Sequence, residues 1–191
     1  AHVCKLSCYD EWQKVIISND KDFLQLCDEN TILYRPTADV LMNKKRIIED
    51  YGVHPSNMAL ARAIDGDASD NLPGIKGAGL KSISKRLSFL ASEKDYTIDE
   101  VIEFCENTDS NLKFFSNIVE GKDIIEHNYK MMQLYSPMLS YQSKDFVRNA
   151  VEEFDCNFNK TQIIKKTRED GFGELNWEEL KTYLNRIASN C

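Results

Sequence analysis

Two aspartates and a cluster of glycines lie close together in the segment 65–79, and they suggest two kinds of chemistry. Asp67 and Asp70 are three residues apart, so a helical turn would place both carboxylates on one side. Such a pair suits a hard divalent cation, because Mg²⁺ prefers oxygen ligands and keeps several of its waters. The alternative is structural, since aspartate also caps helices and forms Asx turns.

The residues that follow these aspartates predict a turn whose backbone could bind an anion. Pro73 and three glycines interrupt any helix there, and glycine lets bare N–H groups approach a phosphate. A helix that begins at Gly79 or Leu80 would direct its positive end toward the same place. The segment from Asn71 to Ser92 contains basic residues but no acidic one, although an ordinary helix connection remains the alternative. The candidate anion-binding residues are Gly74, Lys76, Gly77, Gly79, Lys81, Lys85 and Arg86.

A second carboxylate pair follows a short β-branched run. Lys14–Ser18 predicts a strand that is buried on both faces of a parallel sheet, and Asp20 and Asp22 come directly after it. On extended backbone, side chains two residues apart share a face, and open α/β sheets bind ligands at the carboxyl ends of their strands. The structural alternative is that one of the two aspartates caps a short helix predicted over Asp22–Leu26.

Both segments resemble the flap endonuclease and 5′→3′ exonuclease family. The matching stretches are Gly-Asp-Ala-Ser-Asp-Asn-Leu-Pro-Gly-Ile-Lys-Gly-Ala-Gly-Leu-Lys at 66–81 and Val-Ile-Ile-Ser-Asn-Asp-Lys-Asp-Phe-Leu-Gln-Leu at 15–26. Two matches in this order are more specific than either motif alone. The chain looks closest in style to the phage RNase H-type members, and the resemblance covers nearly all of it.

The resemblance implies a structure-specific 5′ nuclease that acts in DNA replication on 5′ flaps, 5′ ends or RNA primers by two-metal hydrolysis. It implies that the segment 66–81 opens a helix-hairpin-helix element that grips duplex DNA, with K⁺ as a further ion at its turn. The expected partners are DNA with a 5′ flap or 5′ end, or an RNA–DNA hybrid, and replication proteins are candidate partners of a monomer. The residues implied to be catalytic and to bind Mg²⁺ (or Mn²⁺), two ions in the intact enzyme, are Asp20, Asp22, Asp67 and Asp70.

Members of this family also carry, before the part that the chain resembles, a strand with a metal-binding aspartate, a basic helical arch and an acidic helix start. No Asp or Glu precedes Asp10 in this sequence. We therefore expect the chain to be a fragment that shows little or no hydrolysis by itself. A non-catalytic helix-hairpin-helix DNA-binding module is the main alternative function, and a related PIN-type nuclease acting on RNA is a weaker one.

Hydrophobic periodicity predicts an α/β segment followed by helices. By the resemblance, residues 1–40 are the C-terminal part of a PIN-like 5′ nuclease domain with a partial parallel sheet. Residues 41–191 are then a helical DNA-binding domain, with the helix-hairpin-helix at about 60–90. An initial helix is predicted to end near Trp12, and a second strand covers Thr31–Tyr34. Further helices are predicted over Lys44–Tyr51, Pro55–Ile64, Leu80–Leu90, Ile98–Cys105, Leu112–Val119, Ile124–Leu134, Thr161–Thr167 and Trp177–Ile187.

Composition favours a cytoplasmic protein, which the resemblance places in a phage-infected or bacterial cell. The 191 residues are 42% hydrophobic, enough for one ordinary core or two small ones. No apolar run approaches the ~20 residues that cross a bilayer, and no signal-peptide pattern opens the chain, so we expect no membrane partner. The six cysteines lack Cys-x-x-Cys spacing and are interpreted as reduced packing residues. The net charge of −7 is unevenly distributed, because the acidic stretch 95–110 contains no base.

Overall fold

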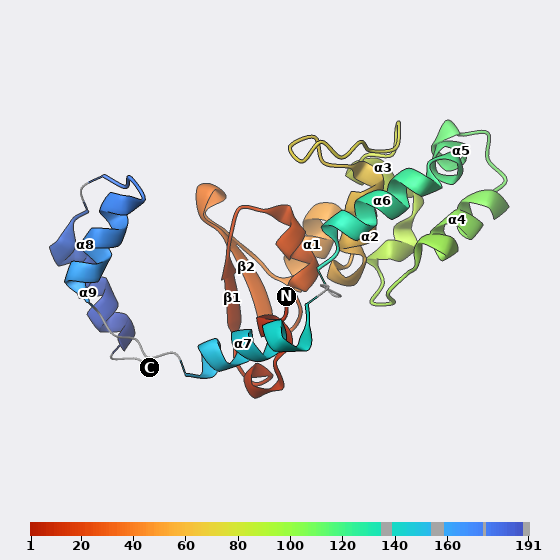
Figure 1. The fold of residues 1–191 in the computed structure, drawn as a ribbon. Coiled ribbons are helices and arrows are strands. Elements are labelled where there is room, and N and C mark those ends of the chain that lie inside the picture. The colour runs from red at the N-terminus through yellow and green to blue at the C-terminus, as the bar shows by residue number, and fades with distance from the viewer. Residues whose placement is uncertain (135–138, 154–158, 174, 189–191) are drawn as a thin grey trace. The chain divides into compact units, whose positions relative to one another are not determined.

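The computed structural model describes residues 1–134, 139–153, 159–173 and 175–188 (Figure 1). The chain divides into two compact units, Ala1–Lys144 and Asp145–Cys191. This division lies elsewhere than the domain boundary expected near residue 40, which stays a prediction. Within the first unit, buried side chains from both sides of residue 40 form one hydrophobic cluster, which includes Leu24, Leu33, Ile47, Met58 and Ile125.

A small mixed sheet lies in the first unit. It contains β1 (Lys14–Ile17), β2 (Thr31–Arg35) and β3 (Val40–Met42), in the order β1-β2-β3. β1 and β2 are parallel, as the sequence predicted, whereas β3 pairs antiparallel with β2. Strand β3 was not predicted, because three residues are too few to produce a recognisable alternation.

Only one face of this sheet is buried in the core. Leu33 and Met42, which pair across β2 and β3, are 0% and 2% exposed. On the other face Ile17 is 69% exposed and Leu41 is 54% exposed. The expectation that the first strand is buried on both faces is therefore wrong, because the side chains of β1 alternate between the core and solvent.

The segments around the sheet are mostly tight 3₁₀ turns. The predicted initial helix is wrong: two short 3₁₀ helices, η1 (Val3–Lys5) and η2 (Ser7–Tyr9), occupy that region, separated by Leu6 in an extended conformation. The predicted short helix after β1 is the 3₁₀ helix η3 (Lys21–Leu26), and η4 (Pro36–Ala38) leads into β3.

The helices predicted after residue 40 are present: Lys44–Tyr51 has its predicted bounds, and the others have shifted ends. The helix predicted over Leu80–Leu90 splits into α3 (Leu80–Arg86) and the 3₁₀ helix η5 (Ser88–Ala91), and α7 (Tyr141–Glu152) was not predicted. The helices are α1 (Lys44–Tyr51), α2 (Pro55–Asp65), α3 (Leu80–Arg86), α4 (Ile98–Asn107), α5 (Lys113–Glu120), α6 (Lys122–Met132), α7 (Tyr141–Glu152), α8 (Lys160–Glu169) and α9 (Trp177–Ala188). Throughout the described parts of the chain, no helix has the length and apolar character that a membrane span requires.

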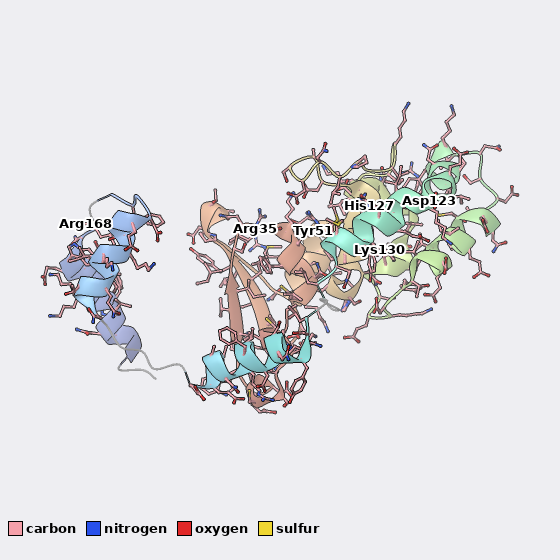
Figure 2. All side chains as sticks on the ribbon, in the orientation of Figure 1. Arg35, Tyr51, Asp123, His127, Lys130 and Arg168 are labelled. Atoms are coloured by element: carbon pink, nitrogen blue, oxygen red, sulfur yellow. The ribbon has the colours of Figure 1, made fainter. Side chains whose placement is uncertain are left out.

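Helix α2 is the central element of the first unit. It starts with Pro55 in its first turn, a position that costs no hydrogen bond, and every residue from 57 to 64 is buried. Helix α6 packs beside it (Figure 1) through its buried face. The outer side of α6 carries the exposed residues Asp123, His127 and Lys130 (Figure 2). Helix α2 thus contacts both η3 and α6.

Candidate active site

Asp20 lies in the loop after β1 and caps η3. Its backbone is extended, and its Oδ1 accepts the N–H of Asp22 at 2.8 Å. The capping contact that the sequence left open as an alternative is therefore present. The Asp20 side chain is exposed, so a carboxylate is available near the carboxyl end of β1, where α/β sheets bind ligands.

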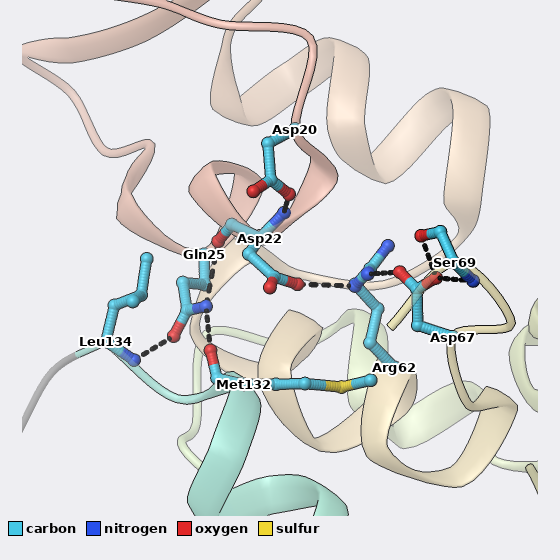
Figure 3. Close-up of polar contacts among 8 residues, drawn as sticks. All are labelled: Asp20, Asp22, Gln25, Arg62, Asp67, Ser69, Met132 and Leu134. Atoms are coloured by element: carbon cyan, nitrogen blue, oxygen red, sulfur yellow. Dashed lines mark hydrogen bonds and ion pairs between the residues drawn. The ribbon is translucent and has the colours of Figure 1, made fainter. Parts of the chain in front are cut away.

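Asp22 is half-buried, and a buried glutamine holds its backbone (Figure 3). Gln25 Nε2 donates to the carbonyl oxygens of Asp22, at 2.8 Å, and Met132, at 2.9 Å. Its Oε1 accepts the N–H of Leu134 at 2.8 Å. Gln25 thus ties η3 to the end of α6. Burial raises the pKa of the Asp22 carboxyl above its ordinary value, and the Arg62 guanidinium opposes that rise.

Asp67 and Asp70 lie on a narrow turn, so the helical turn expected from their spacing is wrong. Asp67 and Leu72 exchange two backbone hydrogen bonds of 2.9 and 2.8 Å, and Asn71 adopts a positive φ of 57° between them. Asp67 Oδ1 accepts the N–H and the hydroxyl of Ser69, as in an Asx turn. The Ser69 hydroxyl is the main cause that lowers the pKa of Asp67, to about 2. Asp67 is therefore ionised at neutral pH, and Asp70 is exposed.

Arg62, on α2, is a central residue of this site that was not predicted from the sequence. Its Nε lies 2.8 Å from Asp22 Oδ1, and its Nη2 lies 2.5 Å from Asp67 Oδ2 (Figure 3). The guanidinium therefore joins the two carboxylate pairs, which are far apart in sequence. The sequence does single out Arg62, because it is the one charged residue in the otherwise uncharged, largely apolar run 57–64.

Three of the four predicted metal ligands line one cavity of about 310 Å³. Oxygen donors of this kind suit a hard divalent cation, and Asp22 Oδ1 is a buried oxygen without a hydrogen-bond partner. Among the described residues, however, no three His, Cys, Asp or Glu side chains form a group that could hold a metal ion. The residues fit a divalent cation by chemical type, and their metal-binding and catalytic roles remain predictions. The cavity is lined by Asn19, Asp20, Lys21, Arg62, Asp67, Ser69 and Asp70.

Two glycines allow the turn between α2 and α3 to fold back on the end of α2. A Cβ at Gly74 would lie 1.8 Å from the Asp65 carbonyl oxygen, and a Cβ at Gly66 would lie 2.3 Å from the Gly74 nitrogen. Gly74 thus has a structural role that does not depend on DNA. At Gly77, where φ is 82°, an added Cβ would meet no atom within 4 Å. The backbone at Gly77 is therefore open to a ligand.

Helix α6 and the residues before it hold this turn through side-chain amides. Asn128, which is fully buried, donates to the carbonyl oxygens of Ala63, at 2.9 Å, and Pro73, at 2.8 Å. Asn117, on α5, donates to the carbonyl oxygen of Lys76 at 2.8 Å. These contacts fix the turn against the core. A K⁺ ion at its carbonyl oxygens stays a prediction.

The predicted basic contacts differ in their surroundings. Lys76, Lys81 and Lys85 are exposed, which leaves their ammonium groups accessible to a phosphate backbone. Arg86 is half-buried, and its guanidinium carbon lies 5.0 Å from the centre of the Phe114 ring, within the range of a cation–π contact. The lysines are therefore better placed than Arg86 to reach an external anion.

The start of α3 is already capped by a carboxylate. Asp65 Oδ1 accepts the N–H of Leu80 at 3.3 Å, and burial raises the pKa of the Asp65 carboxyl. One of the first N–H groups of this helix is therefore already bound by a carboxylate of the protein. An anion at this turn would have to use the open backbone around Gly77 and the exposed lysines.

Comparison with known proteins identifies homologues, although no family model matches the sequence. A 5′-3′ exonuclease of Aquifex aeolicus (strain VF5) is 32% identical over 124 residues, which are 64% of this chain and 39% of that protein. The DNA polymerase I of Rhizobium leguminosarum is 27% identical over 177 residues, which are 92% of this chain and 15% of that protein. The chain is a homologue of these proteins and spans about two fifths or less of their lengths.

Solved structures of bacteriophage T5 proteins share the fold. A T5 5′-exonuclease with bound divalent metal ions (zinc) gives a TM-score of 0.62 at 16% identity, covering 79% of this chain and 58% of that one. A T5 flap endonuclease in a complex with DNA and metal ions gives 0.61 at 17% identity, covering 79% and 57%. These likenesses confirm the predicted fold class, a small sheet combined with a mainly helical part.

Proposed function

We propose that this homologue of 5′-3′ exonucleases provides metal-binding carboxylates and a DNA-gripping helix pair to a structure-specific 5′ nuclease. The observation that carries the proposal is the cavity in which Asp20, from the loop after β1, meets Asp67 and Asp70, from the turn after α2. The names of the relatives support the nuclease class. Because the chain spans only 39% of the Aquifex relative, the activity of the whole protein is itself part of the proposal.

The proposed chemistry is hydrolysis of a phosphodiester bond. When bound, divalent cations such as Mg²⁺ or Mn²⁺ neutralise charge on the phosphate and supply a more acidic water. Hydrogen bonds within the chain orient the carboxylates that would bind the cations. The N–H of Asp22 donates to Asp20, and the N–H of Ser69 donates to Asp67. The side chains that would hold the cations are Asp20, Asp22, Asp67 and Asp70.

The proposed substrate is DNA with a 5′ flap or 5′ end, or an RNA–DNA hybrid. The exposed lysines of the turn and of α3, together with the open backbone at Gly77, would contact phosphates and fix the position of the duplex. Phosphate contacts of this kind position a protein without reading the bases. The T5 flap endonuclease in a complex with DNA and metal ions supports DNA as the ligand class.

Cleavage of a labelled 5′-flap DNA tests the proposal. The assay uses the 191-residue chain alone and the same chain joined to the N-terminal portion of the Aquifex relative, each with Mg²⁺ or Mn²⁺. We expect metal-dependent cleavage by the joined protein and little or none by the chain alone. Asp20→Asn and Asp67→Asn should abolish cleavage, whereas Asp109→Asn, at an exposed aspartate between α4 and α5, should not.

Two results would contradict this assignment. Cleavage that persists in Asp67→Asn would show that the carboxylates of the cavity are not the catalytic ones. Tight binding of flap DNA by a joined protein that cleaves no 5′-ended substrate would instead support the DNA-binding module.

A further inference from the structure

Arg62 lies in an unusual position for an arginine. It is 5% exposed, on a helix whose neighbouring side chains form the core of the first unit. Its guanidinium lies between two carboxylates, those of Asp22 and Asp67, whose side chains are 18% and 19% exposed (Figure 3). One buried positive charge thus faces two acidic side chains from two different segments.

The chemistry of these groups makes them depend on one another. A guanidinium does not lose its proton in proteins, so a buried arginine requires partners of opposite charge. The contact with Asp67 is a hydrogen bond. The contact with Asp22 is an ion pair in which Arg62 Nε lies 2.8 Å from Asp22 Oδ1. Asp22 is therefore held by charge, and another cation at this oxygen must compete with the guanidinium for it.

We propose that Arg62 is a built-in counter-cation that holds Asp22 and Asp67 together, and that a divalent cation competes with it for these carboxylates. The inference rests on the proposed function, since it takes both aspartates as metal ligands. It goes further by assigning Arg62 the role of a positioning residue that controls how tightly the site binds metal.

Loss of Arg62 should have two opposite effects, a decrease in the stability of the metal-free protein and an increase in its affinity for metal. Removal of one member of a buried charge cluster leaves the others unpaired, so loss of Arg62 should destabilise the metal-free protein. The same loss removes a positive charge that repels the incoming cation, so metal binding should become tighter. An arginine with a purely structural role would produce the first effect without the second.

Thermal unfolding with and without Mn²⁺ separates these effects. Arg62→Met keeps an unbranched apolar stem of similar length, and we expect its Tm in EDTA to fall by roughly 5–15 °C. The rise in Tm on addition of Mn²⁺ should be larger than in the wild-type chain, and calorimetric Mn²⁺ binding should be roughly fivefold tighter or more. The Tm in EDTA and the Mn²⁺ affinity of Arg62→Lys should lie between those of the wild-type chain and those of Arg62→Met, because lysine keeps the charge and lacks the planar fork of the guanidinium.

Two further variants complete the experiment. Arg46→Met removes an exposed arginine that pairs with Asp50 on α1, and it should change neither the metal-free Tm nor the response to Mn²⁺. If Arg62→Met does not fold, Arg62→Met combined with Asp22→Asn and Asp67→Asn removes all three charges together. That triple variant should fold and should lose the response to Mn²⁺.

Three results would overturn the inference. These are an unchanged metal-free Tm in Arg62→Met, Mn²⁺ binding in that variant that is no tighter than in the wild-type chain, and no response to Mn²⁺ in either protein. The readouts need neither DNA nor cleavage. An inactive nuclease and a wrong role for Arg62 are therefore distinguishable.

Discussion

Single buried polar side chains position the candidate site. Gln25 is 1% exposed and uses both ends of its amide to join η3 to the end of α6, and the Asn128 amide group joins α6 to the end of α2 and the turn after it. A buried amide that makes such hydrogen bonds stabilises one arrangement of the segments that it connects. The position of Asp22 therefore depends on α6, which lies more than a hundred residues away in sequence.

Gln25→Leu should destabilise the first unit. The substitution leaves the carbonyl oxygens of Asp22 and Met132 and the N–H of Leu134 without their present partners, which costs roughly 1–3 kcal/mol for a buried group. Urea denaturation followed by circular dichroism measures the change. Gln13→Leu, which removes an exposed amide, is the control and should change stability by less than about 0.5 kcal/mol. Equal stability of the two variants would show that the Gln25 hydrogen bonds contribute nothing.

These residue-scale interactions were beyond the reach of the sequence. The aspartates were predictable, because acidic residues at the end of a strand and before a glycine turn form recognisable patterns. Arg62, Gln25 and Asn128 are isolated polar residues within helical segments, and no local pattern shows which partner each will meet. Their roles follow only from the packing of α2 against η3 and α6.

At the scale of elements, the turn after α2 shows how backbone geometry restricts sequence. Gly66 and Gly74 lie where the chain passes close to the end of α2, and the hydrogen bonds between Asp67 and Leu72 close the loop between them. The glycines and Pro73 predicted a turn, and a turn is present. The sequence did not reveal its form, because the spacing of Asp67 and Asp70 is compatible with both a helical turn and a hairpin-like turn.

Gly74→Ala should be much more damaging than Gly→Ala changes elsewhere. Its Cβ would lie 1.8 Å from the Asp65 carbonyl oxygen, so the backbone must move, and we expect a decrease in stability of about 3 kcal/mol or more. Gly173→Ala, where an added Cβ meets no atom within 4 Å, should change stability by less than about 1 kcal/mol. Urea denaturation of both variants makes the comparison. A Gly74→Ala protein as stable as the Gly173→Ala protein would contradict the close approach seen here.

At the scale of the whole molecule, the sequence predicted the class of fold, but it did not predict that one face of the sheet is exposed. Parallel pairing of β1 and β2 and the succession of helices followed from hydrophobic periodicity. The exposure of the outer face of the sheet could not be predicted in this way. Val15 and Ile17 form the same β-branched run whether or not a second layer of structure covers them. Periodicity reports which residues are apolar, and burial depends on which elements are present to pack against them.

The distribution of charge over the molecule gives the last prediction. The chain is acidic overall, with a net charge of −7, but Lys76, Lys81 and Lys85 project from the turn and from α3 in a segment without acidic residues. Only charges within about 10 Å of a phosphate act on it strongly at 0.1 M salt, so these lysines affect a nearby phosphate more than acidic residues beyond that distance do. We expect the affinity for 5′-flap DNA to fall steeply as salt rises, because binding to each phosphate releases counterions.

Removal of the three lysines together tests this expectation. The Lys76→Ala, Lys81→Ala and Lys85→Ala triple variant should bind all sequences more weakly, and its salt slope should fall by roughly one unit for each phosphate that a lysine no longer neutralises. The matched control replaces Lys45, Lys165 and Lys166, exposed lysines on α1 and α8, and so changes the net charge equally. Fluorescence anisotropy at several salt concentrations measures both slopes. If the two triple variants show the same decrease in affinity, total charge and not the turn attracts DNA, and the helix pair would lose its proposed role.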